Sequence, residues 1–104
     1  MNEAYNIIKD TTSLHISYDL DVIDPEIAPG VSVPEFDGIN EEEALKINEC
    51  ILRRMKDVVS YDLVEFNPLR DIDRKTEQIA LNLLAQVIPY ARNKDKYDNK
   101  KPLY

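Results

Sequence analysis

Acidic side chains gather in two separate stretches of the 104-residue sequence. Asp19, Asp21 and Asp24 lie in the stretch D-L-D-V-I-D, and Glu65 stands far downstream in the segment V-E-F-N-P. Two carboxylates held close together repel one another and are stabilised by a cation. Their hard oxygen atoms suit Mg²⁺, Ca²⁺ or Mn²⁺ better than a soft metal. The D-x-D pair is therefore a candidate metal site, and two solvated aspartates at the end of a strand are the alternative.

Glu65 has two interpretations. In the functional one, its carboxylate holds a cationic group of a substrate, and planar bidentate pairing favours a guanidinium or an amidinium. In the other, it is a glutamate at the end of a strand that hydrogen-bonds a loop. The residue type alone leaves both interpretations open.

The single histidine and the single cysteine add little to this chemistry. His15 precedes Asp19 by about 13 Å along an extended strand, which is too far to share a metal with it, so we expect a packed strand histidine. Cys50 has no histidine near it in the sequence, and we expect a small residue in or near the core rather than a nucleophile. One cysteine also excludes an intramolecular disulfide and a cysteine-based zinc site.

Composition and charge narrow the class of protein. Hydrophobic residues make up 43% of the chain and charged residues 32%, which is typical of a single globular domain. Thirteen basic and twenty acidic residues give a net charge of -7, and this acidic field would repel a nucleic acid. No apolar run approaches the roughly 20 residues that span a bilayer, so we expect no membrane partner. With a polar start to the chain, we expect a cytoplasmic protein.

Hydrophobic periodicity and turn residues predict the elements that position the acidic side chains. They are a helix at 1–9, a strand at 14–20, a proline-rich loop at 25–38, a helix that begins after Asn40, a strand at 58–66 and a helix at 75–91. Asn40 and Glu43 have the spacing of a capping box, and Pro89 is expected to bend or end the last helix. Residues 1–92 form one predicted domain, and the lysine-rich residues 93–104 form a predicted surface tail. The predicted inward residues are Ala44, Ile47, Ile51, Leu52 and Met55 on the first of the two long helices, and Ile79, Leu83, Leu84 and Val87 on the second.

Two strands joined by a helical crossover should be parallel and right-handed. This βαβα order predicts an α/β fold with a doubly wound parallel sheet. Ligands of such sheets bind beyond the carboxyl ends of the strands, so three or four of the carboxylates of Asp19, Asp21, Asp24 and Glu65 should meet at one edge. Two parallel strands are too few to stand alone, and we expect the chain to join an oligomer or the remainder of a longer chain.

The acidic segments resemble known motifs of the ureohydrolase superfamily of arginases, agmatinases and formiminoglutamases. The first match comprises Ser17-Tyr18-Asp19-Leu20-Asp21, Pro25, Pro29-Gly30 and Gly38, which fit the spacing of the family's third signature. The second comprises Val64 to Pro68 with Asp71 and Thr76, which is similar to the family's E-x-N-P-x-x-D segment. The resemblance covers about residues 14–88 and implies an arginase-like fold of which this chain is the C-terminal third.

The resemblance also implies a function for each acidic residue. Asp19 matches the aspartate that bridges two Mn²⁺ ions, and Asp21 matches the aspartate that binds the second ion. Glu65 matches the glutamate that holds the guanidinium or formimino group of a small amidine substrate. In the family, a hydroxide shared by the two metals attacks the amidine carbon, which is two-metal hydrolysis.

Two departures from the family pattern shape the expected function. The segments that carry the other metal ligands, of the types G-G-D-H and D-A-H-x-D, do not occur in these 104 residues, so we expect this fragment alone to be inactive. Val22 after the D-x-D pair and the loop A-P-G-V-S-V-P favour formiminoglutamate as substrate, with arginine next and agmatine third.

One alternative to this catalytic function is a non-catalytic module that associates with a full-length homologue. Another is a stand-alone domain that binds Ca²⁺ or Mg²⁺ through Asp19, Asp21 and Asp24.

Overall fold

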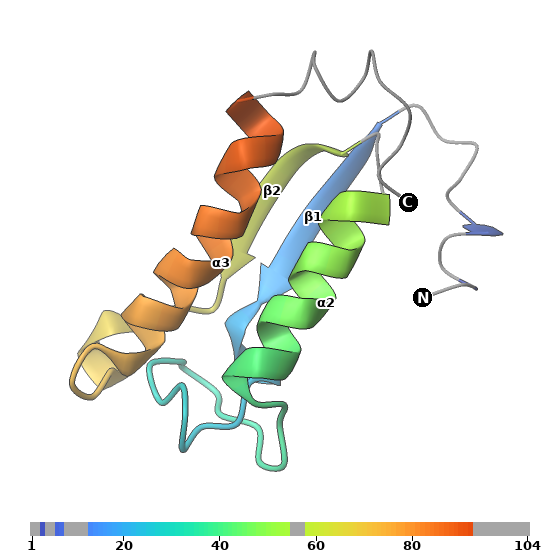
Figure 1. The fold of residues 1–104 in the computed structure, drawn as a ribbon. Helices are drawn as coiled ribbons and strands as arrows, with labels where there is room; N and C mark the ends of the chain where they lie inside the picture. Colours follow the sequence, from blue (N-terminus) through green and yellow to red (C-terminus); the bar gives the residue numbers. More distant parts are fainter. Residues whose placement is uncertain (1–2, 4–5, 8–12, 55–57, 93–104) are drawn as a thin grey trace.

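The computed structural model describes residues 3, 6–7, 13–54 and 58–92. The predicted helix at 1–9 lies mostly outside these residues, and the predicted tail at 93–104 lies entirely outside them. The described part contains two strands and two long helices in the order β1, α2, β2, α3 (Figure 1). Within it, none of the helices combines the length and the apolar composition that a membrane crossing requires.

The two strands, β1 (Leu14–Asp19) and β2 (Val58–Val64), pair in parallel, as the βαβ order predicted. Asp19 is in register with Val64, so both strands end side by side. Each strand is shorter than predicted. β1 gives way to a short 3-10 helix, η1 (Leu20–Val22), and β2 ends where Glu65 adopts a φ of 72°. A positive φ turns the chain out of the extended conformation, which explains the early end of β2.

The helix α2 (Glu41–Arg54) begins with the predicted capping box. The backbone N–H of Glu43 donates to Asn40 Oδ1 at 2.8 Å, and the backbone N–H of Asn40 donates to Glu43 Oε1 at 3.1 Å. Three glutamates in the first turn place negative charge at the positive end of the helix dipole. The cap and the charges together fix the start of α2 one residue after Asn40.

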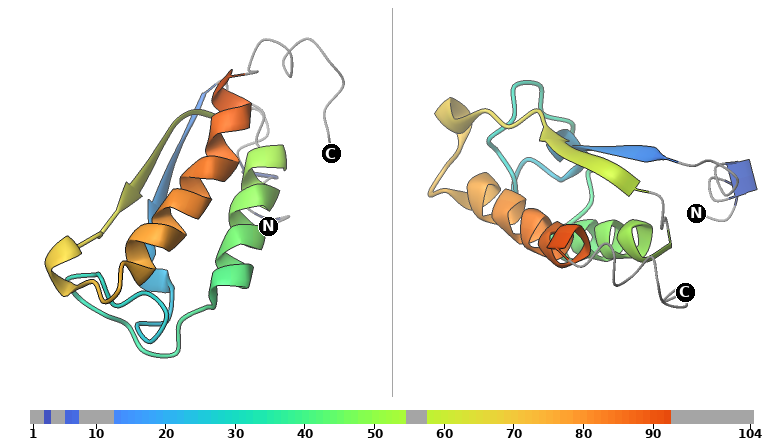
Figure 2. Two further views of the ribbon diagram at one scale, coloured as in Figure 1. Left: turned by 60° about the vertical axis from the view of Figure 1, so that its left-hand side comes forward. Right: turned by 90° about the horizontal axis from the view of Figure 1, so that it is seen from above.

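The helix α3 (Lys75–Arg92) packs beside α2, and both lie on the same face of the sheet (Figure 2). The helix α3 does not end at Pro89 but continues for three more residues to Arg92. Proline has no N–H to donate within a helix, and here only three helical residues follow it.

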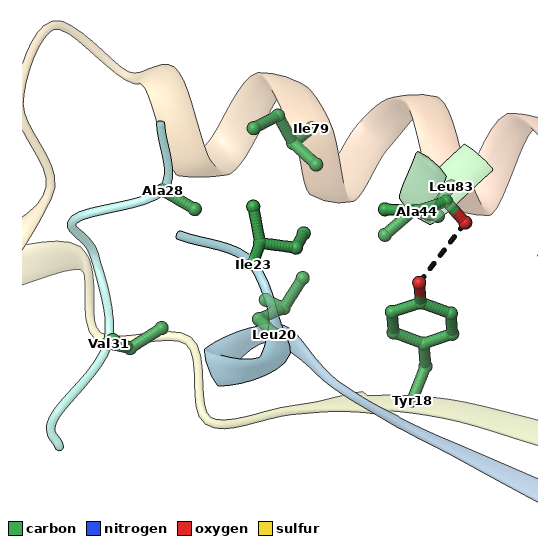
Figure 3. Close-up of a cluster of buried hydrophobic side chains, with 8 residues drawn as sticks. All are labelled: Tyr18, Leu20, Ile23, Ala28, Val31, Ala44, Ile79 and Leu83. Carbon is green, nitrogen blue, oxygen red and sulfur yellow. Dashed lines mark hydrogen bonds between the residues drawn. The ribbon is translucent and has the colours of Figure 1, made fainter. Parts of the chain in front are cut away.

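The core lies between the sheet and the two helices (Figure 3). Its buried residues are Tyr18, Leu20, Ile23, Ala28, Val31, Ala44, Ile79 and Leu83. Tyr18 also donates a hydrogen bond from its hydroxyl to the carbonyl of Ala44 at 3.1 Å. Burial confirms Ala44, Leu52, Ile79 and Leu83 as inward residues, and Ile51 and Val87 are half-buried, whereas Met55 lies outside the described residues. Ile47 and Leu84 were predicted inward but are 42% and 39% exposed.

A polar residue, Asn48, takes the buried position on α2 that an apolar pattern does not predict. Its Nδ2 donates to the carbonyl of Leu83 at 3.3 Å and to Gln86 Oε1 at 2.8 Å. The hydroxyl of Tyr61 donates to Asn48 Oδ1 at 2.6 Å. Asn48 therefore connects α2 to both α3 and β2, and its buried polar atoms are satisfied.

His15 is not the packed histidine that the sequence predicted. Side chains alternate along a strand, so His15 lies on the sheet face opposite to Tyr18, which neither of the described long helices covers. The side chain of His15 is 52% exposed. Its Nδ1 lies 2.6 Å from Ser60 Oγ, and its Nε2 lies 3.2 Å from Asp62 Oδ2.

Candidate metal and amidine site

Asp19 and Asp21 come together through a turn at the end of β1. Asp19 is the last residue of β1, and Asp21 lies in the 3-10 helix that follows. The backbone N–H of Asp21 donates to Asp19 Oδ1 at 3.0 Å, so Asp19 caps this short helix. The cap fixes the carboxyl group of Asp19 over the backbone of Asp21.

The electrostatics of Asp21 reveal a cluster of four acids. Desolvation by burial is the largest cause that raises the pKa of Asp21 to about 6, and the next is a hydrogen bond with Asp19. The negative charges of Asp19, Glu65 and Glu35 raise it further. A carboxyl group whose pKa is raised by like charges is one that a bound cation would stabilise. The structure thus brings the three predicted residues together and adds Glu35, which no motif or periodicity had indicated.

Glu65 is held at the edge of the sheet by its two neighbours in the chain. Val64 is in register with Asp19, and Phe66 forms an isolated bridge with Val31. Between these fixed points, Glu65 has a φ of 72°, a region that residues other than glycine rarely adopt. A residue of this kind persists only where the surrounding structure over-determines it, and such residues cluster at functional sites. Glu65 is exposed, so its carboxylate is available to a ligand.

Asp24 does not belong to this cluster. Its Oδ1 accepts the backbone N–H of Glu26 at 2.9 Å, which closes a turn in the loop. In the described ranges, no group of three or more histidine, cysteine, aspartate or glutamate side chains is arranged to hold a metal ion. The hypothesis of a stand-alone cation site built from Asp19, Asp21 and Asp24 is therefore wrong. The oxygen donors of Asp19 and Asp21 fit a hard divalent cation, but they supply only part of its coordination sphere.

The loop between β1 and α2 is tied back to the turn that carries Asp21. The backbone N–H of Ile39 donates to the carbonyl of Val22 at 2.9 Å, and the backbone N–H of Asp24 donates to the carbonyl of Ile39 at 2.9 Å. Gly38 lies against the same backbone. A side chain there would collide with it, which gives the glycine of the resemblance a steric reason.

Gly38→Ala should destabilise the protein by roughly 1–3 kcal/mol or more, because the new Cβ has no space. It would lie 2.5 Å from the carbonyl oxygen of Val22 and 2.6 Å from the nitrogen of Asp24. Gly30→Ala is the matched comparison, since its Cβ would meet only side-chain atoms of Asp71 and Thr76, at 3.0 Å. Denaturant unfolding should give the larger loss for Gly38→Ala, and an equal or smaller loss would contradict this packing.

A second set of contacts joins the loop to the segment that carries Glu65. The backbone N–H of Gly30 donates to Thr76 Oγ1 at 2.8 Å, and the carbonyl of Gly30 accepts the N–H of Asn67 at 2.7 Å. Asp71 accepts the backbone N–H groups of Thr76 at 2.9 Å and Glu77 at 3.0 Å, at the start of α3. The residues of the second motif therefore lock the loop, the segment after β2 and α3 together.

Asp71 should make the stability of this junction depend on pH. Burial alone would raise the pKa of Asp71, but the N–H groups of Thr76, Glu77 and Ile72 and the side chain of Thr76 together hold it below its ordinary value. A lowered pKa in the folded state means that the charged form stabilises the fold. That contribution is complete above the ordinary pKa of 3.8 and is lost as the pH falls through the lowered value.

Asp71→Asn tests this dependence, because asparagine presents an N–H₂ group where Asp71 accepts from Glu77. In urea unfolding, the stability difference between the unmodified protein and the variant should be constant near neutral pH. It should shrink once the pH drops below the ordinary carboxyl range. A difference that stays the same down to strongly acidic pH would show that the charge of Asp71 contributes nothing.

The sequence and the structure of this chain are both similar to those of known proteins. The sequence model of the Arginase family matches residues 1–89. An arginase from Brevibacillus brevis is 35% identical over 88 residues, which cover 84% of this chain and 29% of the relative. A formimidoylglutamase from Hahella chejuensis is 36% identical over 74 residues, covering 71% of this chain and 23% of the relative. The crystal structure of arginase from Bacillus subtilis matches with a TM-score of 0.75 and 31% identity, over 84% of this chain and 30% of that one.

Three facts follow from these matches. This chain spans less than a third of the length of each of the three proteins. Its βαβα arrangement is a portion of the α/β fold that the solved relatives share. The identities to the arginase and to the formimidoylglutamase differ by a single percentage point, so they express no preference between the two.

Proposed function

Because the chain belongs to the arginase family, we propose that it forms the carboxylate-bearing part of a ureohydrolase active site. The reaction is hydrolysis of a non-peptide C–N bond in a linear amidine such as formiminoglutamate, arginine or agmatine. The observation that carries this proposal is the cluster of Asp19, Asp21 and Glu65. They come from the ends of two parallel strands and stand close enough for their charges to interact.

Asp19 and Asp21 are the residues of this chain that would hold a pair of Mn²⁺ ions. When bound, the metal pair supplies a hydroxide at neutral pH by lowering the pKa of a coordinated water. The capping bond from the N–H of Asp21 holds one oxygen of Asp19 in place. This leaves the rest of the Asp19 carboxylate to face the metals.

Glu65 is the proposed substrate-binding residue. A carboxylate can pair with a planar amidinium through two parallel hydrogen bonds, which fixes the orientation of the group as well as its position. Its unusual backbone conformation at the end of β2 supports this role. Glu65 would hold the amidine carbon next to the metals without binding a metal itself.

The remaining ligands must come from outside the described residues, since these contain no complete metal-binding group. We propose that they belong to further residues of a longer chain or to a second chain. The 104-residue fragment by itself would then be inactive. The matches cover only 29% and 23% of the two relatives, which supports this division.

The test is hydrolysis by the protein purified from its own cells with an antibody against residues 93–104. The purified protein is stripped with a chelator and assayed on formiminoglutamate, arginine and agmatine, before and after addition of Mn²⁺. Turnover of at least one amidine that returns with Mn²⁺ is the expected result. No turnover of any of the three after Mn²⁺ addition contradicts the proposal.

A non-catalytic module that regulates a full-length homologue is the second candidate, and the incomplete metal-binding group of the described residues favours it. The mass of the natively purified protein separates the two. A species several times larger than 12.0 kDa supports the catalytic proposal. A 12.0 kDa chain that co-purifies with a larger arginase-family protein supports the regulatory module. The same antibody on fractionated cells tests the proposed cytoplasmic location.

A further inference from the structure

Thr76 lies at the start of α3 and is fully buried, although its side chain is polar. Its Oγ1 accepts the backbone N–H of Gly30 at 2.8 Å, and its hydroxyl hydrogen-bonds the carboxylate of Asp71. A buried hydroxyl is stabilised when it both donates and accepts a hydrogen bond. The side chain of Thr76 therefore joins the start of α3 to the loop at Gly30.

The contact with Gly30 extends to the segment that carries Glu65. The carbonyl of Gly30 accepts the backbone N–H of Asn67 at 2.7 Å, and Val31 forms an antiparallel bridge with Phe66. Gly30 and Val31 thus pair with the two residues that directly follow Glu65. We call this pairing the anchor.

Glu65 depends on the anchor for its backbone conformation. Its φ of 72° lies in a region that residues other than glycine rarely adopt, and such a residue persists only where neighbouring contacts impose it. On one side of Glu65, Val64 is in register with Asp19 on β1. On the other side, the anchor fixes Phe66 and Asn67. Loss of the anchor would leave Glu65 fixed by β2 alone, while the strand pairing that positions Asp19 would remain.

The hydroxyl of Thr76 holds the anchor from its interior side. Gly30 is buried as well, and a Cβ at this position would lie 3.0 Å from the Cβ of Thr76. Removal of the hydroxyl would leave the N–H of Gly30 buried without its acceptor, which costs more than the loss of an exposed hydrogen bond. The backbone around Gly30 would then shift to reach another acceptor, and the anchor would shift with it.

We propose that Thr76 is a positioning residue, which acts through the anchor to hold the carboxylate of Glu65 against the amidine substrate. This inference rests on the proposed function and deepens it, because Thr76 would touch neither the substrate nor a metal ion. Its hydroxyl should therefore affect how the amidine is oriented and not how much Mn²⁺ is bound. A misplacement of about 1 Å at a reacting centre can cost about 100-fold in rate.

The test replaces Thr76 by valine and by serine in the native protein loaded with Mn²⁺. Valine keeps the shape of threonine without the hydroxyl, whereas serine keeps the hydroxyl and loses the methyl group. For the amidine that the unmodified protein hydrolyses, Thr76→Val should lower kcat/KM by about 10- to 100-fold and leave the Mn²⁺ content unchanged. Thr76→Ser should retain most of the activity, because it keeps the acceptor for Gly30.

Combination with Glu65→Gln tests whether Thr76 acts through Glu65. Two residues that act through the same contact have non-additive effects. In the Glu65→Gln background, Thr76→Val should therefore lower kcat/KM much less than it does alone. Hydrogen exchange measured by mass spectrometry adds a readout other than activity. The peptide that covers residues 65–69 should exchange faster in Thr76→Val than in Thr76→Ser.

Tyr61→Phe is the matched control, because it also removes a hydroxyl from an interior hydrogen bond, here to Asn48 Oδ1 at 2.6 Å. This control should leave kcat/KM and the exchange of residues 65–69 unchanged. Equal losses of kcat/KM in Thr76→Val and Tyr61→Phe overturn this inference alone. An undiminished effect of Thr76→Val in the Glu65→Gln background does so as well. Absence of turnover on every amidine by the unmodified protein overturns the proposed function and this inference with it.

Ser32→Ala tests the anchor without a change in the interior, and it decides the question if Thr76→Val does not fold. Ser32 is exposed, and its Oγ accepts the side-chain amide of Asn67 at 3.2 Å. Ser32→Ala should lower kcat/KM about two- to tenfold, which is the effect of one neutral hydrogen bond. It should have almost no further effect in the Glu65→Gln background. An unchanged kcat/KM in Ser32→Ala would then overturn the inference.

Discussion

Replacement of Asp19 by asparagine should abolish Mn²⁺-dependent amidine hydrolysis in the native protein and reduce its Mn²⁺ content. Removal of an outer partner of a metal ligand already costs about 10- to 100-fold in affinity or activity, so loss of a bridging ligand should cost more than about 100-fold. Asparagine keeps an oxygen that can accept the N–H of Asp21, which preserves the cap of the short helix. The expected loss of turnover therefore reflects loss of the metal ions and not loss of the fold.

Asp62→Asn provides the control for this experiment. Asp62 lies on β2, its side chain is 48% exposed, and its contact is with His15 on the open face of the sheet. Asp62→Asn replaces a carboxylate by an amide, as Asp19→Asn does, but at a position away from Asp19, Asp21 and Glu65. Metal content by mass spectrometry and turnover should both remain near those of the unmodified protein. If Asp19→Asn retained its Mn²⁺ and its rate, the assignment of Asp19 as a metal ligand would be wrong.

Replacement of Glu65 by glutamine has the second largest expected effect, and its signature differs from that of Asp19. The neutral amide cannot form the charge-assisted bidentate pair with an amidinium. We expect kcat/KM to fall by about 100- to 1,000-fold, as for other groups that stabilise charge at a reacting centre. The Mn²⁺ content should remain unchanged, because Glu65 is not a proposed ligand.

The two variants together form a diagnostic pair. Asp19→Asn should lose metal and turnover together, whereas Glu65→Gln should lose turnover only. Loss of Mn²⁺ from Glu65→Gln would make Glu65 a metal ligand. Full turnover by Glu65→Gln would remove it from the site altogether, and its strained backbone would then need another explanation.

The features that follow from local chemistry could be predicted from the sequence. The capping box of Asn40 and Glu43 depends only on residues three apart, and the structure contains both of its hydrogen bonds. The parallel pairing of β1 and β2 follows from the crossover between them. That pairing also explains why Asp19 and Glu65, far apart in sequence, could be expected at one edge of the sheet.

The features that depend on tertiary contacts could not be predicted in this way. Asn48 is buried because Tyr61, Leu83 and Gln86 satisfy its amide, and no periodic pattern encodes those partners. The charge of Glu35 raises the pKa of Asp21 from a loop whose two ends are fixed by backbone contacts, and the proline-rich sequence predicted only that a loop was present.

The most direct test of the proposed site is anomalous X-ray diffraction at the manganese absorption edge, on crystals of the natively purified protein loaded with Mn²⁺. The account predicts two anomalous peaks, both beside the carboxylate of Asp19 and one of them also beside the carboxylate of Asp21. The carboxylate of Glu65 should face the pair without contacting either peak. Peaks bound elsewhere, with none at Asp19 or Asp21, would contradict the assignment of this edge of the sheet as the metal centre.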